Sequence, residues 1–166
     1  MRGVGAQVDP GVAAIADEAD SPHPNPSPEG EGLRFAGYAA VFDAVDRGGD
    51  VVRRGAFGAL KGRQVPLLWQ HRPDAPLGYV ETMAEDARGL RVVARVSGRT
   101  AAGRAAMAML RDGARDGGAM GGLSFGYRVK AARGERPREL LALDLVEVSL
   151  VRAPMQPLAR VVAVEG

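Results

Sequence analysis

Three side chains that could act together in covalent catalysis lie far apart in the sequence: His71, Ser124 and Glu147. Ser124 stands in Gly122-Leu123-Ser124-Phe125-Gly126, where the two glycines let other groups approach the hydroxyl closely. The chain has two histidines, and His23 lies in a proline-rich stretch, so His71 would have to supply any imidazole. An imidazole has an unperturbed pKa of about 6.5, which suits a general base that activates a serine.

Glu147 is the acid that could orient this imidazole. It lies within residues 140–151, a stretch that is apolar on both faces of a strand. A carboxylate there is costly to bury unless it accepts hydrogen bonds, and an imidazole N–H is a suitable donor whose tautomer would then be fixed. An arginine partner is the alternative, since the chain is rich in arginine. Asp144 is a competing acid, but alternation along a strand points it to the other face.

The pattern around Ser124 also matches the nucleophile elbow of α/β-hydrolases, and we reject that interpretation. An elbow needs a strand, a turn and a helix in succession, whereas residues 127–130 continue as a strand. That fold also places its histidine after the serine, and no histidine follows Ser124 here. Two plain alternatives stay open: an ordinary strand serine, and a histidine held by hydrogen bonds at a strand edge.

Short apolar and alternating runs predict that strands position these groups. The expected strands cover residues 33–42, 65–69, 77–83, 90–96, 122–130, 140–151 and 158–164. Apolar residues at helical spacing predict a helix over residues 100–112 that Gly113 ends, and a short helix is expected within residues 55–60. Many strands with one dominant helix indicate a mostly-β domain, a β-barrel flanked by a few α-helices.

Composition excludes several kinds of chemistry. The 166 residues contain no cysteine, which rules out disulfides and thiolate sites. The sequence has no run of about 18 apolar residues and no secretory pattern, so we expect a soluble, intracellular chain without membrane contact. The scarcity of histidine argues against a histidine-rich metal site, and we expect no cofactor. No platform of aromatic and basic residues supports specific nucleic-acid binding.

The first 32 residues differ from the rest in charge. They hold six acidic residues and one basic residue, a net charge of −5, whereas residues 33–166 hold 21 basic and 14 acidic residues, a net charge of +7. Proline recurs at every second position from Pro22 to Pro28, which blocks helices and sheet ladders. We therefore expect a flexible, acidic, proline-rich tail over residues 1–32 and one folded domain over residues 33–166.

Several short stretches, taken in order, carry a family resemblance. They are Gly37-Tyr38-Ala39, Gly55-Ala56-Phe57, Leu68-Trp69-Gln70-His71, Pro76-Leu77-Gly78, residues 122–127, residues 145–151 and Pro154. Together they resemble the prohead serine proteases of tailed bacteriophages, the family typified by phage HK97, over about residues 33–164. One departure is Pro154-Met155-Gln156-Pro157, where the family more often has Pro-Ala-Asn-Pro.

The resemblance implies a serine endopeptidase that trims the prodomain of the major capsid protein inside the immature shell, in the cytoplasm of a bacterial host, and then usually cleaves itself. It also implies a fold like that of the herpesvirus assembly proteases, a β-barrel wrapped by helices. Their catalytic residues follow the chain order histidine, serine and a third member, which corresponds here to His71, Ser124 and Glu147. Backbone N–H groups, with an arginine such as Arg152, would stabilise the oxyanion.

The implied partners are the major capsid protein, as substrate, and a second copy of the chain, for self-cleavage or as a dimer. Two alternatives stay open. The first is a scaffolding module of the same fold that has lost its activity. The second is a domesticated relative that serves a gene-transfer particle and keeps the chemistry.

Overall fold

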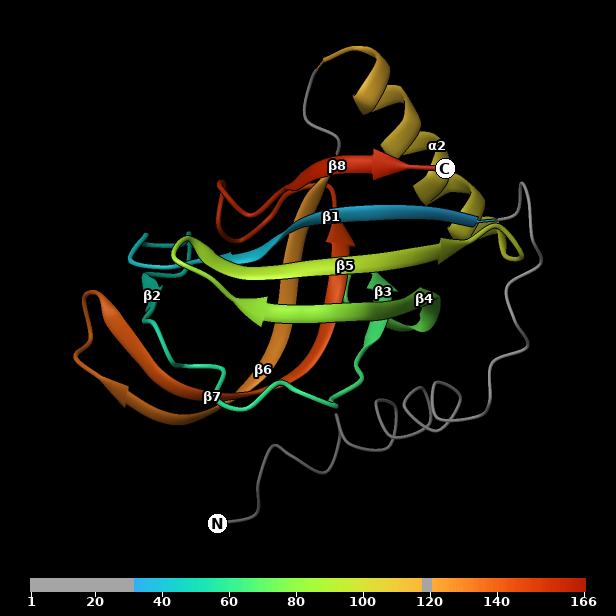
Figure 1. Cartoon of the computed structure of the whole chain (residues 1–166). Coiled ribbons are helices and arrows are strands. Elements are labelled where there is room, and N and C mark those ends of the chain that lie inside the picture. Colours follow the sequence, from blue (N-terminus) through green and yellow to red (C-terminus); the bar gives the residue numbers. More distant parts are fainter. Residues whose placement is uncertain (1–31, 118–120) are drawn as a thin grey trace.

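Strands dominate the chain wherever its structure is described. The computed structural model describes residues 32–117 and 121–166 (Figure 1). Within these ranges the apolar runs form β1 (Gly32–Val41), β2 (Asp50–Val52), β3 (Pro66–Trp69), β4 (Arg72–Glu85), β5 (Gly89–Ser97), α2 (Ala101–Arg115), β6 (Gly122–Arg133), β7 (Arg138–Val151) and β8 (Val161–Glu165). The mostly-β class predicted from the sequence is therefore confirmed.

The strands form one sheet with an open order. Neighbouring strands pair in the order β2-β7-β3-β4-β5-β1-β8, and β6 pairs with β7 outside this path. The sequence predicted a barrel with a few helices, but over residues 32–117 and 121–166 the sheet is not closed and α2 is the one helix. Closure is incomplete because β8 is short and pairs with β1, while a single bridge, between Gly122 and Arg160, joins β6 to the segment before β8.

β7 lies between the two segments that carry the other candidate residues. On one side it runs parallel to β3, with Leu68 opposite Ser149. On the other side it runs antiparallel to β6, with Ser124 opposite Ser149 and Gly126 opposite Glu147. Directly opposed residues of paired strands point to the same face. One face of the β6–β7 pair therefore carries Ser124, Ser149 and Glu147. Figure 1 shows this long pair crossing β1, β5 and β4 steeply.

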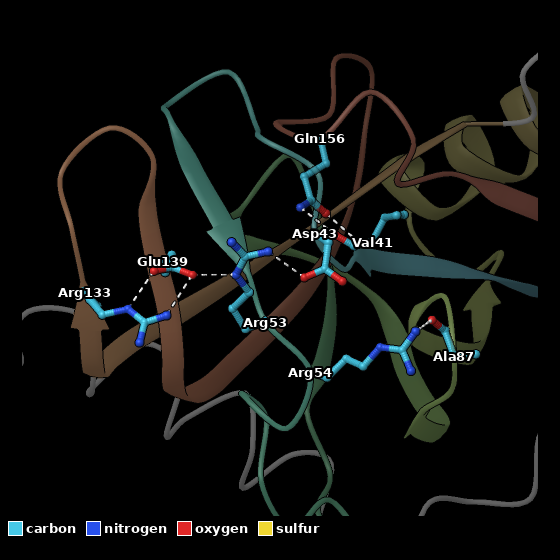
Figure 2. Close-up of polar contacts among 8 residues, drawn as sticks. All are labelled: Val41, Asp43, Arg53, Arg54, Ala87, Arg133, Glu139 and Gln156. Atoms are coloured by element: carbon cyan, nitrogen blue, oxygen red, sulfur yellow. Dashed lines mark hydrogen bonds and ion pairs between the residues drawn. The ribbon is translucent and has the colours of Figure 1, made fainter.

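An exposed ion-pair network holds β2 against β7. β2 pairs with the beginning of β7 in parallel, and Arg53, just after β2, donates to Glu139 of β7 at 2.8 Å and to Asp43 at 2.7 Å (Figure 2). Arg133 donates to the other oxygen of Glu139 at 2.7 Å. The hydrogen bonds from Arg133 and Arg53 lower the pKa of Glu139 to about 2. The Glu139 carboxylate therefore stays ionised, and able to accept these hydrogen bonds, down to acidic pH.

α2 packs against β4, β5 and β8 and buries one face, which includes Leu110. It begins as predicted, since the side-chain oxygen of Thr100 accepts a backbone N–H of the first turn at 3.0 Å. It ends at Arg115, two residues past the predicted stop at Gly113, because the N–H of Asp116 still bonds to the carbonyl four residues back at 3.0 Å. A glycine inside a helix costs about 1 kcal/mol, and burying one leucine offsets that with about 1.5–3 kcal/mol.

Two expectations fail or fall outside the described ranges. Residues 55–57 form a turn and residues 58–60 have no regular structure, in place of the expected short helix, because Gly55 and Gly58 have φ values of 83° and 64°, which a right-handed helix excludes. The tail expected over residues 1–32 lies almost entirely outside the described residues, so its boundary with the domain stays a prediction. Among the described helices, none has the length and apolar character needed to cross a membrane.

Candidate active site

His71 lies in a backbone conformation that non-glycine residues seldom adopt. Gln70 and His71 directly follow β3 with φ values of 52° and 58°, and each such residue costs of order 1–3 kcal/mol. The N–H of Gln70 donates to the Leu150 carbonyl at 3.0 Å. The side-chain oxygen of Gln70 accepts the N–H of Arg152 at 3.1 Å, and the N–H of His71 donates to Ser149 Oγ at 3.0 Å. The end of β7 thus fixes the turn that directs the imidazole.

Glu147 contacts this imidazole from β7. Its Oε1 contacts His71 Nδ1, and its Oε2 accepts the hydroxyl proton of Ser149 at 2.6 Å. These bonds replace the water that the buried carboxylate loses, since Glu147 is only 5% exposed. The hydrogen bond to Glu147 raises the pKa of His71 above its ordinary value of 6.5, and partial burial of the ring acts against this rise. Because Nδ1 is engaged, Nε2 is the nitrogen available for proton transfer.

Ser124 opens onto the same cleft as His71. The cleft has a volume of about 150 Å³, and His71, Ser124, Asp50, Tyr127, Met155 and Gln156 are among the residues that line it. Ser149, directly opposite Ser124 on β7, is 0% exposed, compared with 7% for Ser124. Of these two serines, Ser124 is therefore the one that a molecule in the cleft can reach.

The structure separates the competing candidates from this cleft. Asp144, the alternative acid, pairs with Arg63 at 2.9 Å, at a position where both side chains are partly exposed. The guanidinium of Arg152 lies over the ring of Trp69, 5.7 Å from its centre, and Arg152 is not among the residues lining the cleft. The cleft is therefore lined by the imidazole of His71 and the hydroxyl of Ser124, and the buried Glu147 contacts that imidazole, whereas Asp144 and Arg152 have other partners.

Asp50 lines the cleft with a carboxylate that is paired with an arginine. Arg138 donates to its two oxygens at 2.8 and 2.7 Å, and the hydroxyl of Tyr127 donates to it at 3.2 Å. The hydrogen bonds from Arg138 hold the pKa of Asp50 below its ordinary value, and burial raises the pKa of Tyr127. Sequence reasoning missed this cluster because Asp50 and Arg138 meet only through the pairing of β2 with β7.

The loop after β7 forms another part of the wall through Met155 and Gln156. Gln156 is buried, and its amide oxygen accepts the N–H of Val41 at 2.7 Å while its amide nitrogen donates to the Val41 carbonyl at 3.0 Å (Figure 2). These two bonds attach the loop to the end of β1. Gln156, which stands where the family more often has Asn, thus satisfies buried backbone groups with its side-chain amide.

The sequence matches one protein family over most of its length. The model of the Caudovirus prohead serine protease family matches residues 22–165, and the chain belongs to this family. The prohead protease of Enterobacteria phage HK97 is 34% identical over 99 residues, which cover 57% of this chain and 42% of that protein. The chain therefore matches less than half the length of this relative.

A solved structure of a herpesvirus protease shares the fold. The protease of KSHV, determined in complex with a hexapeptide phosphonate inhibitor, aligns with a TM-score of 0.53 and 12% identity, covering 82% of this chain and 66% of that one. At this identity the likeness concerns the fold alone. It confirms the expected relation to the herpesvirus assembly protease fold.

Proposed function

We propose that this chain is a serine endopeptidase in which Ser124 is the nucleophile, His71 the general base and Glu147 the acid that orients His71. The observation that carries this proposal is the contact between Glu147 and His71 Nδ1 beside the cleft that Ser124 shares. The chain order histidine, serine and acid supports it, as does membership of the prohead serine protease family.

The proposed chemistry is acyl transfer in two steps. His71 Nε2 takes the hydroxyl proton of Ser124 while Oγ forms a bond to the substrate carbonyl carbon. The imidazolium then gives this proton to the leaving nitrogen as the C–N bond breaks. In the second step His71 Nε2 takes a proton from water as the water oxygen attacks the acyl carbon, and it returns that proton to Ser124 Oγ as the ester bond breaks. Glu147 stabilises the imidazolium at each step, in line with the raised pKa of His71.

The proposed substrate is the prodomain of the major capsid protein, cut inside the immature shell in the bacterial cytoplasm and followed by self-cleavage of the enzyme. The family and the named relative support a role in the maturation of phage or phage-like heads. No cofactor enters this chemistry, because an activated serine and a positioned base suffice for peptide hydrolysis.

Co-expression with the capsid protein encoded beside this gene tests the proposal. Intact-mass measurement should show a shortened capsid protein with the wild type and a full-length one with Ser124→Ala. Ser97→Ala is a matched control, because this hydroxyl, at the end of β5, accepts an exposed bond from the N–H of Arg99. Equal full-length capsid protein with the wild type and Ser124→Ala would refute the enzyme and favour the inactive scaffolding module.

A further inference from the structure

Ser149 is a fully buried hydroxyl on an otherwise apolar strand. It is 0% exposed, and its strand neighbours Val148 and Leu150 are equally buried in the core. A buried hydroxyl needs hydrogen-bond partners to offset the water that it loses. Both partners of Ser149 belong to the candidate active site: the backbone N–H of His71 at 3.0 Å and Oε2 of Glu147 at 2.6 Å.

The chemistry of these groups fixes the direction of each hydrogen bond. A backbone N–H can only donate, so Ser149 Oγ accepts from His71. The hydroxyl has one proton, which must then point to Oε2 of Glu147. With its Oε2 accepting this proton, an ionised Glu147 also accepts at Oε1, so Nδ1 of His71 carries a proton and Nε2 presents its lone pair. The three residues form a closed ring that runs through the backbone and the side chain of the same histidine.

We infer that Ser149 is a positioning residue, whose hydroxyl joins the backbone of His71 to Glu147 and thereby holds the imidazole in the tautomer and orientation that a general base requires. This inference rests on the proposed role of His71. Ser149 touches neither the cleft nor a substrate and acts entirely through these two residues.

The backbone around His71 explains why a hydroxyl is needed at this position. β3 ends at Trp69 and β4 begins at Arg72, so the N–H of His71 lies between the two strands. Its left-handed conformation directs this N–H to the side chain of Ser149. Alanine at position 149 would remove the acceptor of the His71 N–H and the donor to Glu147 Oε2 in a single change.

The other titratable groups that line the cleft beside His71 have hydrogen-bond partners of their own. Asp46, Asp50 and Tyr127 line the cleft together with His71. Arg138 and Tyr127 both donate to Asp50, and Oδ1 of Asp46 accepts two backbone N–H groups of its own loop at 2.8 and 2.9 Å. Glu147 is the group whose hydrogen bond dominates the pKa of His71. A change at Ser149 should therefore reach His71 through Glu147.

Selective ¹⁵N-histidine labelling of the full chain measures this directly, because the chain has only His23 and His71, and His23→Gln assigns the two. In the wild type, we expect His71 to titrate above 6.5 and to keep its Nδ1 proton when neutral. In Ser149→Ala the titration should move down towards 6.5, and the Nδ1 proton signal should broaden. Ser149→Thr, which retains the hydroxyl, should restore both signals.

Activity and stability complete the test. On a capsid-derived peptide, kcat should fall roughly 100-fold in Ser149→Ala with KM nearly unchanged, because a displacement of about 1 Å in a catalytic group costs that much. Thr100→Ala, which removes the cap of α2 at a residue that does not line the cleft, is the stability control and should leave the titration of His71 unchanged. An unchanged His71 titration in Ser149→Ala, or an equal shift in Thr100→Ala, would overturn the inference.

One measurement needs no variant. Hydrogen exchange of the wild type should show a protected amide at His71, since its N–H donates to a fully buried oxygen although it lies outside the strands. Rapid exchange at this amide would contradict the ring. The NMR and exchange results stand even if no peptide is cleaved, so they separate a failure of this inference from a failure of the proposed enzyme.

Discussion

Gly126 lies directly opposite Glu147, and replacing it by alanine tests whether the position of that carboxylate controls activity. A Cβ at Gly126 would lie 2.6 Å from Oε1 of Glu147, the oxygen that contacts His71, and 3.0 and 3.1 Å from its Cγ and Cδ. Ordinary contact begins at 3.4 Å, so the carboxylate must retreat by about 0.8 Å. It cannot do so without weakening its bonds to His71 and Ser149.

The expected cost follows from this displacement. Misplacing a catalytic group by about 1 Å reduces activity roughly 100-fold, whereas overpacking a core position typically costs about 1–3 kcal/mol of stability. We therefore expect Gly126→Ala to fold and to lose about two orders of magnitude in kcat/KM. Gly32→Ala is a control on β1, where the closest contact of the added Cβ would be the Val96 carbonyl at 3.3 Å.

A double-mutant cycle on a capsid-derived peptide identifies the route of the effect. Glu147→Ala removes the atoms that the new methyl group would meet, so Gly126→Ala should change kcat/KM by no more than about twofold in that background. If Gly126→Ala costs the same factor with and without the Glu147 carboxylate, the loss has another origin and the reasoning is refuted.

Four further predictions have defined outcomes. Activity should rise with pH through the raised pKa of His71, above 6.5, and Glu147→Gln should move this midpoint down; an unmoved midpoint would contradict the hydrogen bond as its cause. The raised pKa of His71 also stabilises the fold: this contribution is fully present below pH 6.5 and is lost as the pH rises through the raised pKa. Urea unfolding at a series of pH values should therefore show a gradual decline in the free energy of unfolding over that range. Gln156→Ala should cost about 1–3 kcal/mol in urea unfolding, because it leaves the buried N–H and carbonyl of Val41 unpaired; a loss below the error of the measurement would exclude that role. The pKa of Asp50 is lowered, so the stability that its carboxylate contributes is present above pH 3.8 and is lost as the pH falls through the lowered pKa. Asp50→Asn should therefore weaken the dependence of the unfolding free energy on acid pH. An unchanged dependence would count against the pairing with Arg138.

Much of the candidate site could be predicted from the sequence, because few residues could supply its chemistry. A single histidine outside the proline-rich stretch, a serine between glycines and two acids on opposite faces of one apolar strand left little choice. The structure adds that Glu147 contacts His71 whereas Asp144 pairs with Arg63, which alternation along the strand had indicated.

Other features depend on backbone geometry that residue patterns do not reveal. Residue patterns do not single out Ser149, because its link to His71 requires two consecutive left-handed residues after β3. The segment at residues 55–60 was expected to be helical, although its glycines adopt positive φ values. The barrel was expected to close, and whether a sheet closes depends on long-range pairing that local periodicity does not determine.

The most direct measurement uses a serine-directed fluorophosphonate with the purified chain, followed by peptide mapping of the adduct by mass spectrometry. We expect one adduct on Ser124, strongly slowed in His71→Ala and absent in Ser124→Ala. An adduct on another serine, or equal labelling of the wild type and Ser124→Ala, would show that Ser124 is not the activated nucleophile.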